Sequence, residues 1–163
     1  MPATARVFVA LGSNLDDPMQ RIREAMLALD APPFGRCVAR SSFYLSAPVG
    51  FLDQPDFVNA VVELCSPLAP LALIDALLAL EQRLGRTRGA RNAPRRIDLD
   101  LLACDARRLH TPELTLPHPR AAERAFVLLP WQEIAPEFEL PGLGRIADLA
   151  RALPASAIRR MDA

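Results

Sequence analysis

Hydrophobic and polar positions follow two periods along this chain, and their alternation predicts an order of secondary-structure elements. Four short runs that carry apolar residues have the length of strands. The first is rich in β-branched residues and is closed by the turn residues Gly12, Ser13 and Asn14. These strand-like runs cover residues 6–11, 36–46, 57–65 and 96–103. Two segments of helical spacing separate them: residues 18–31, which Pro18 begins and Pro32 ends, and residues 70–84, which Gly85 follows. The predicted order is therefore strand, helix, strand, strand, helix, strand.

This order is typical of the ferredoxin-like βαββαβ arrangement, an α+β fold built on an antiparallel sheet. Its two helices cover one face of the sheet and leave the other face free for a site. Residues 47–55 are too rich in proline to be regular and predict a long surface loop. After the fourth strand we expect a short edge addition at residues 107–110, helices at residues 120–130 and 146–153, and a frayed end. The prediction is one domain, residues 1–163, with a helical and irregular C-terminal extension.

Composition places the chain among ordinary globular proteins. Of its 163 residues 51% are hydrophobic and 23% charged, and the formal net charge is zero, so there is no overall attraction to nucleic acids or membranes. Lysine is absent, so a single arginine says little and only clusters of arginine are informative.

Cys37, Cys65 and Cys104 lack the CxxC spacing of zinc or redox sites and predict buried free thiols. With no leader segment and no apolar run of transmembrane length, we expect a cytoplasmic protein.

A dense run of arginines precedes a pair of aspartates in the fourth predicted strand. Alternation along that strand places the side chains of Asp98 and Asp100 on the same face, a few ångströms apart. Two carboxylates at this spacing suit hard cations such as Mg²⁺ that also bind phosphate oxygens, although acidic residues on a half-solvated strand are the simpler alternative. The arginines can pair bidentately with phosphate, or can line a solvated loop. They are Arg83, Arg86, Arg88, Arg91, Arg95 and Arg96.

The two histidines differ in their setting. His110 follows a short strand-like piece and is expected to be exposed, whereas His118 lies between prolines and close to Arg120 and Arg124. This rigid position makes His118 a candidate donor to phosphate, although a lone histidine is more often structural. The absence of lysine excludes a Walker A loop, and the sequence contains neither GxSxG nor HExxH. Transfer of a phosphoryl-type group, which relies on positioning and charge, suits these residues best.

Several short motifs lie in a fixed order along the chain. They are Leu11-Gly12-Ser13-Asn14-Leu15, Ser42-Phe43-Tyr44 with Pro48 and Gly50, the run from Asp53 to Ala60, Glu81 with Gly85 to Arg88, the run from Pro94 to Asp100, and the run from Pro117 to Leu128. Together they resemble the 6-hydroxymethyl-7,8-dihydropterin pyrophosphokinase family of folate biosynthesis. The resemblance extends from Val7 to Pro136, and the combination of IDLD with DQPDFVNA is its most specific part.

The resemblance implies the ferredoxin-like fold and transfer of pyrophosphate from ATP to the hydroxymethyl oxygen of the pterin, with release of AMP. It implies that Asp98 and Asp100 bind two Mg²⁺ ions, which bridge the ATP phosphates and the acceptor hydroxyl. The implied phosphate contacts are Arg86 and Arg95 on the moving phosphates, with Arg88, Arg91, His118 and Arg124 as further contacts. The implied pterin contacts are the rings of Phe57 and Phe126, the amide of Asn59, and the backbone of Ser46, Ala47 and Val49.

Two positions depart from the pattern of the family. Asn92 stands where many members have a tryptophan that helps to close the loop over substrates, and Pro119 stands where some have a tyrosine. Asn92 leaves open a diverged paralogue with weak or altered activity on pterin or nucleotide.

A ferredoxin-like nucleic-acid-binding module is another alternative, but Asp98 and Asp100 without metal would repel a phosphate backbone. By analogy with the family we expect a monomer that acts on ATP and the pterin, with no nucleic-acid or membrane partner.

Overall fold

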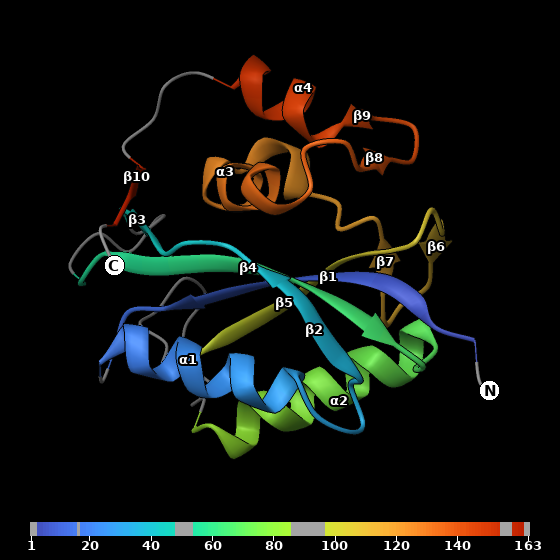
Figure 1. Cartoon of the computed structure of the whole chain (residues 1–163), viewed down its shortest axis with the longest axis horizontal. Coiled ribbons are helices and arrows are strands. Elements are labelled where there is room, and N and C mark those ends of the chain that lie inside the picture. The colour runs from blue at the N-terminus through green and yellow to red at the C-terminus, as the bar shows by residue number, and fades with distance from the viewer. Residues whose placement is uncertain (1–2, 16, 48–53, 86–96, 154–157, 162–163) are drawn as a thin grey trace.

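A six-stranded antiparallel sheet with helices on both sides forms the centre of the molecule, so the fold is mixed α/β (Figure 1). The computed structural model describes residues 3–15, 17–47, 54–85, 97–153 and 158–161. None of the helices within these ranges is long and apolar enough to cross a membrane.

The sheet strands pair in the order β10-β3-β4-β1-β5, and β2 pairs with the same strand, β4, as β3 does. Their bounds are β1 (Ala5–Ser13), β2 (Arg36–Arg40), β3 (Tyr44–Ser46), β4 (Phe57–Ser66), β5 (Asp98–Cys104) and β10 (Arg159–Arg160). The strands predicted at residues 6–11, 57–65 and 96–103 are confirmed, with ends that differ by one or two residues. The hydrophobic pattern therefore identified the three longest strands correctly.

The strand predicted at residues 36–46 is wrong as a single element, because a bulge divides it into β2 and β3. Arg40 pairs with Val62 and Tyr44 pairs with Asn59. The segment from β2 to β3 therefore advances four residues while β4 advances only three. Ser41 stays attached to the partner strand: its N–H donates to the carbonyl of Val61, and its hydroxyl accepts the N–H of Val61, both at 2.9 Å. One extra residue therefore enters the ladder immediately before β3.

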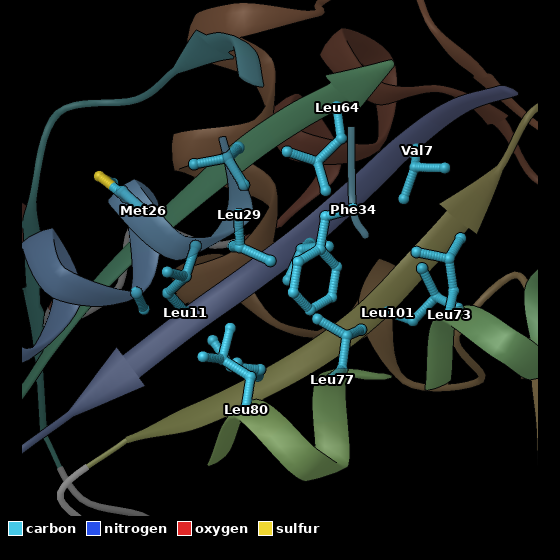
Figure 2. Close-up of a cluster of buried hydrophobic side chains, with 14 of the residues drawn as sticks. Val7, Leu11, Met26, Leu29, Phe34, Leu64, Leu73, Leu77, Leu80 and Leu101 are labelled. Carbon is cyan, nitrogen blue, oxygen red and sulfur yellow. The ribbon is translucent and has the colours of Figure 1, made fainter. Parts of the chain in front are cut away.

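The first face of the sheet carries helices α1 (Pro18–Leu29) and α2 (Pro70–Arg83), as predicted. Apolar side chains that alternate along the strands meet the buried stripes of both helices (Figure 2). Figure 2 labels Val7, Leu11, Met26, Leu29, Phe34, Leu64, Leu73, Leu77, Leu80 and Leu101 in this cluster. Burial of each such side chain contributes roughly 1.5–3 kcal/mol relative to exposure, so this layer anchors the sheet.

The second face of the sheet is half covered, so the prediction of a wholly open face is wrong. Helices α3 (Ala125–Ile134) and α4 (Ile146–Ala152) lie over it (Figure 1). The ring of Trp131 on α3 is fully buried and lies 5.1 Å from the ring of Phe8 on β1, centroid to centroid. Phe8 alternates onto the second face, and its apolar surface requires a cover.

The end of the chain contains more strand than predicted. Leu109–His110 (β6) pairs with Thr115–Leu116 (β7) as a separate hairpin, not as an addition to the sheet edge. The predicted frayed end is wrong for Arg159–Arg160, which pairs with β3, while residues 162–163 lie outside the described part of the chain. The remaining short elements are a 3₁₀ helix, η1 (Ala121–Glu123), and the paired strands β8 (Glu139–Leu140) and β9 (Gly144–Arg145). The helices predicted at residues 120–130 and 146–153 correspond to η1 with α3 and to α4.

The three cysteines are free thiols, as predicted. Cys104 is buried, whereas Cys37 and Cys65 are only half-buried, so the prediction of burial holds fully for one of them. Burial raises the pKa of the thiols of Cys37 and Cys104, which makes both less reactive.

Candidate active site

The part of the second face that α3 and α4 do not cover forms a floor, on which three neighbouring strands contribute one row of residues. Gly12 on β1 pairs with Asn59 on β4 at one side and with Asp98 on β5 at the other. Because neighbouring strands lie about 4.8 Å apart, Asn59 and Asp98 are separated by two strand spacings, roughly 10 Å. Alternation along the strands places Phe57 and Asp100 on the same face. The floor therefore carries an amide and an aromatic ring at one side, two carboxylates at the other, and no side chain between.

The amide of Asn59 is held in one orientation by its neighbours. Its side chain is buried, with the residue 5% exposed, and Nδ2 donates to Oγ of Ser46 at 2.8 Å. Nδ2 also approaches the carbonyls of Tyr44 and Phe57 at 3.4 Å. A Cβ built on Gly12 would lie 3.5 Å from Oδ1 of Asn59, so this oxygen lies beside the bare position on the floor. Asn59 therefore offers a ligand an acceptor, and a group with N–H donors matches it.

The two phenylalanines implied by the resemblance come from different layers. Phe57 is half-buried at the start of β4, and its Cδ1 would lie 4.0 Å from a Cβ on Gly12. Phe126 is half-buried in the first turn of α3 and packs against the edge of the core on the second face. Their use as a pair that stacks on both sides of one ring stays a prediction.

The two aspartates lie where alternation predicted them, half-buried and on one face of β5. Among the described residues no three His, Cys, Asp or Glu side chains converge as a complete metal cage. Two adjacent carboxylates nevertheless fit Mg²⁺, which retains water and takes phosphate oxygens as further ligands. Asp98 and Asp100 are the residues that would hold it.

A third carboxylate fixes the strand that carries this pair. Glu81, in the last turn of α2, is 2% exposed and accepts the backbone N–H of Leu99 at 2.7 Å. Leu99 lies between the two aspartates on the outermost strand of that side of the sheet. A charged acceptor makes a strong hydrogen bond to such an N–H, so Glu81 stabilises the position of β5.

His118 faces the same region and is arranged as a neutral donor. Its backbone N–H donates to the carbonyl of Leu102 at 2.9 Å, and Nδ1 accepts the N–H of Arg120 at 3.2 Å. The proton of the neutral ring is therefore on Nε2. Burial lowers the pKa of His118, the positive charges of Arg124 and Arg120 lower it further, and the charge of Asp98 opposes them. His118 can thus donate one hydrogen bond to a phosphate oxygen near the aspartates at neutral pH.

Comparison with known proteins identifies the family to which these residues belong. A model of 7,8-dihydro-6-hydroxymethylpterin-pyrophosphokinase matches residues 8–136. The chain belongs to this family. It is 45% identical over 156 residues, 96% of each chain, to the 2-amino-4-hydroxy-6-hydroxymethyldihydropteridine pyrophosphokinase of Pseudomonas aeruginosa. The enzyme with the same name from Methylorubrum extorquens is 40% identical over 157 residues, 96% of this chain and 99% of that one.

A solved structure supports the fold independently of sequence. The wild-type HPPK-DHPS of Plasmodium falciparum with pteroate superposes with a TM-score of 0.76 at 14% identity. The match covers 93% of this chain and 42% of that longer chain. At 14% identity this similarity shows only that the two proteins share a fold.

Five residues that the resemblance implies lie outside the described part of the chain: Val49, Arg86, Arg88, Arg91 and Arg95. The others are placed. Asn59, Ser46 and Phe57 lie together around Gly12, and His118 lies within electrostatic range of Asp98 and Arg124. The guanidinium of Arg124 lies 5.5 Å from the ring centroid of Phe126, while Ala47 is exposed just after β3.

Sequence reasoning missed several residues that shape this site. Gly12 appeared only as part of a motif, yet it supplies the bare floor. Ser46 was expected to act through its backbone, but its hydroxyl holds Asn59. Asn14 joins the end of β1 to the residues before β4, donating to Gln54 Oε1 at 2.8 Å and to the carbonyl of Pro55 at 3.0 Å. The Gly12-Ser13-Asn14 motif at the end of the first predicted strand was the available signal.

Proposed function

We propose that this family member transfers the terminal diphosphate of ATP to the hydroxymethyl oxygen of 6-hydroxymethyl-7,8-dihydropterin. The hydroxyl oxygen forms a bond to the β-phosphorus, the bond from the β-phosphorus to the oxygen bridging to the α-phosphate breaks, and AMP leaves. The hydroxyl proton is released to solvent in the same reaction. The observation that carries the proposal is the row of Asn59, Gly12 and Asp98. This row places an amide that can bind the edge of a heterocycle on the same surface as a carboxylate that can hold a metal beside phosphate.

The pterin binds at the amide side of the row. Its flat bicycle lies over Gly12, which has no side chain of its own, and its N–H edge donates to Oδ1 of Asn59. Phe57 on the floor and Phe126 on α3 stack on the ring, since offset aromatic stacking favours such a sandwich. Backbone groups of Ser46, Ala47 and Val49 complete the edge contacts. The hydroxymethyl group then points across Gly12 toward β5.

ATP binds at the carboxylate side. Asp98 and Asp100 are the residues that would hold magnesium, which would supply positive charge next to the phosphates. His118 donates from Nε2 to a phosphate oxygen, and Arg124 adds a positive charge close to it. Four arginines outside the described residues complete the phosphate contacts in this proposal: Arg86 and Arg95 on the transferred group, and Arg88 and Arg91 on ATP.

We class the fold as ferredoxin-like. The support is the chain order β1-α1-β2/β3-β4-α2-β5 together with pairing of β4 and β5 on either side of β1. We also propose one domain over residues 1–163, because α3, α4 and β10 all join or cover the same sheet. By analogy with the family, we also propose that the chain acts as a monomer.

An assay with magnesium, ATP and 6-hydroxymethyl-7,8-dihydropterin that separates AMP from ADP tests the proposal. Pterin-dependent AMP is the expected product, and Asp98→Asn and Asp100→Asn are each expected to slow its formation strongly while circular dichroism stays unchanged. Formation of ADP alone, or no turnover by folded protein, would overturn the proposal and favour a diverged paralogue. Omission of magnesium provides the matched control for the aspartate variants.

A further inference from the structure

Hydrogen bonds to Glu133, in the last turn of α3, tie this helix to the bulge before β3. The carboxylate accepts the backbone N–H of Ser42 at 3.1 and 3.0 Å, the hydroxyl of Ser42 at 3.0 Å, and the hydroxyl of Tyr44 at 2.8 Å. Arg160 on β10 lies 4.0 Å away with a side chain that is 63% exposed, so this ion pair contributes little. The side chain of Glu133 itself is 26% exposed. Its main partners are therefore the three donors of Ser42 and Tyr44.

Ser42 belongs to the segment that contains the extra residue of the bulge. A bulge leaves one residue out of the ladder, so its N–H must find another acceptor. Here both oxygens of Glu133 accept that N–H. Charged hydrogen bonds are roughly twice as strong as neutral ones, so the carboxylate favours this bulged pairing over a regular one.

The bulge determines which face the next side chains occupy. Because side chains alternate, a shift of register by one residue would turn every following side chain to the opposite face. With the bulge in place, Tyr44 and Ser46 pair with Asn59 and Phe57 and share the face of the site. Only then does Oγ of Ser46 lie 2.8 Å from Nδ2 of Asn59.

We propose that Glu133 is a positioning residue for the pterin: by holding the bulge it keeps Ser46 against Asn59 and thereby fixes which way the amide presents its acceptor. Glu133 touches neither the floor nor the aspartates, so it acts through other residues. The consequence for pterin binding rests on the function proposed above, whereas the orientation of the Asn59 amide does not.

Removing the charge of the Glu133 carboxylate should therefore weaken binding of the pterin and leave binding of ATP unchanged. In Glu133→Gln the dissociation constant of 6-hydroxymethylpterin should rise by about tenfold, the equivalent of roughly one net hydrogen bond. The dissociation constant of a non-hydrolysable ATP analogue with magnesium should stay within about twofold of the wild type, a change of under 0.5 kcal/mol. Glu139→Gln, at an exposed glutamate on β8, is the matched control and should change neither.

The chain contains its own reporter of the contact, because Tyr44 is its single tyrosine. Burial raises the pKa of Tyr44 to about 12, the hydrogen bond and charge of Glu133 raise it, and the charge of Arg160 opposes them. At about pH 10.5 an exposed tyrosine is mostly ionised, whereas Tyr44 should show little tyrosinate absorbance. Glu133→Gln should increase that absorbance, and fluorescence of Trp131 at the same pH verifies that the fold is intact.

Two measurements separate failure of this inference from failure of the proposed function. The side-chain amide signal of Asn59 in a heteronuclear NMR spectrum, assigned by its loss in Asn59→Asp, needs no ligand. It should move in Glu133→Gln and move similarly in Ser46→Ala. If the signal and the tyrosinate absorbance are unchanged, or if pterin and nucleotide weaken in parallel with thermal stability, Glu133 is merely structural and the inference is wrong. If they change but the wild type binds no pterin, only the proposed function fails.

Discussion

Adding one methyl group at Gly12 should stabilise the folded protein and at the same time lower its catalytic efficiency. Gly12 has no positive backbone φ angle, and a Cβ there would meet its nearest atom, Asn59 Oδ1, at 3.5 Å, an ordinary contact distance. Alanine therefore fits without strain. Because glycine inside a strand costs about 0.5–1 kcal/mol relative to alanine, Gly12→Ala should raise the free energy of unfolding by about 0.5 kcal/mol.

The same methyl group should lift the pterin from the floor. A Cβ projects about 1.5 Å from Cα, so a ring that rests on Gly12 must move by a comparable distance. A misplacement of about 1 Å can cost 10²-fold in rate, so kcat/KM for the pterin should fall by about 100-fold. Pterin-dependent release of AMP measures kcat/KM, and urea unfolding followed by circular dichroism measures stability.

Ala10→Gly is the inverse substitution at the next position of β1 on the same face, beneath the cover of α3 and α4. It should lose about 0.5–1 kcal/mol of stability and retain kcat/KM. An unchanged kcat/KM in Gly12→Ala would refute the placement of the pterin over Gly12. Equal losses in both variants would instead attribute the effect to the strand as a whole.

Four further predictions concern the metal pair, the core on the second face and the ion pairs of Arg6. Asp98→Asn should lower kcat by on the order of 10³-fold in the AMP assay at saturating magnesium, because the variant loses a charged metal ligand, with an unchanged melting temperature. Trp131→Phe should cost under about 1 kcal/mol in urea unfolding, since in the described part of the chain the buried Nε1 lacks a hydrogen-bond partner and its removal relieves a desolvation penalty. Arg6 pairs with Glu63 and Glu137, whose side chains are 15% and 62% exposed, so Glu63→Gln should destabilise more than Glu137→Gln. The hydrogen bond from Arg6 lowers the pKa of Glu137 below its ordinary value of 4.5. The stability that this ion pair contributes is therefore present above pH 4.5 and is lost as the pH falls below it. The urea midpoints of Glu137→Gln and the wild type should converge at low pH.

Hydrophobic period predicted the parts of the fold that local sequence determines. The strands around Val9 and Leu99 and the helix that contains Met26 follow from alternation and helical spacing, and so does the placement of Asp98 and Asp100 on one face. The covered half of the second face could not be predicted in the same way. Its cover comes from α3 and α4, and an apolar helix that follows a sheet does not reveal which surface it will meet.

Features that depend on contacts between distant residues escaped prediction. The bulge between β2 and β3 contacts Glu133, which is 91 positions from Ser42 along the chain. The orientation of Asn59 requires Ser46, and pairing of β10 with β3 joins Arg160 to Tyr44. No local pattern in the sequence encodes such partners, so the chemistry of the site was more predictable than its geometry.

The pairing of β10 with β3 gives the two ends of the chain unequal positions relative to the site. Arg160 pairs with Tyr44, in the same row of the sheet as Asn59, whereas Ala5 pairs with Ser66 at the other end of β4. The seven positions between Asn59 and Ser66 correspond to about 23 Å along a strand. A purification tag or a second enzyme fused before β1 would thus begin far from the substrates. The same addition after β10 would instead begin beside β3, where Met161 donates to the carbonyl of Phe43, one row from the pairing of Tyr44 with Asn59.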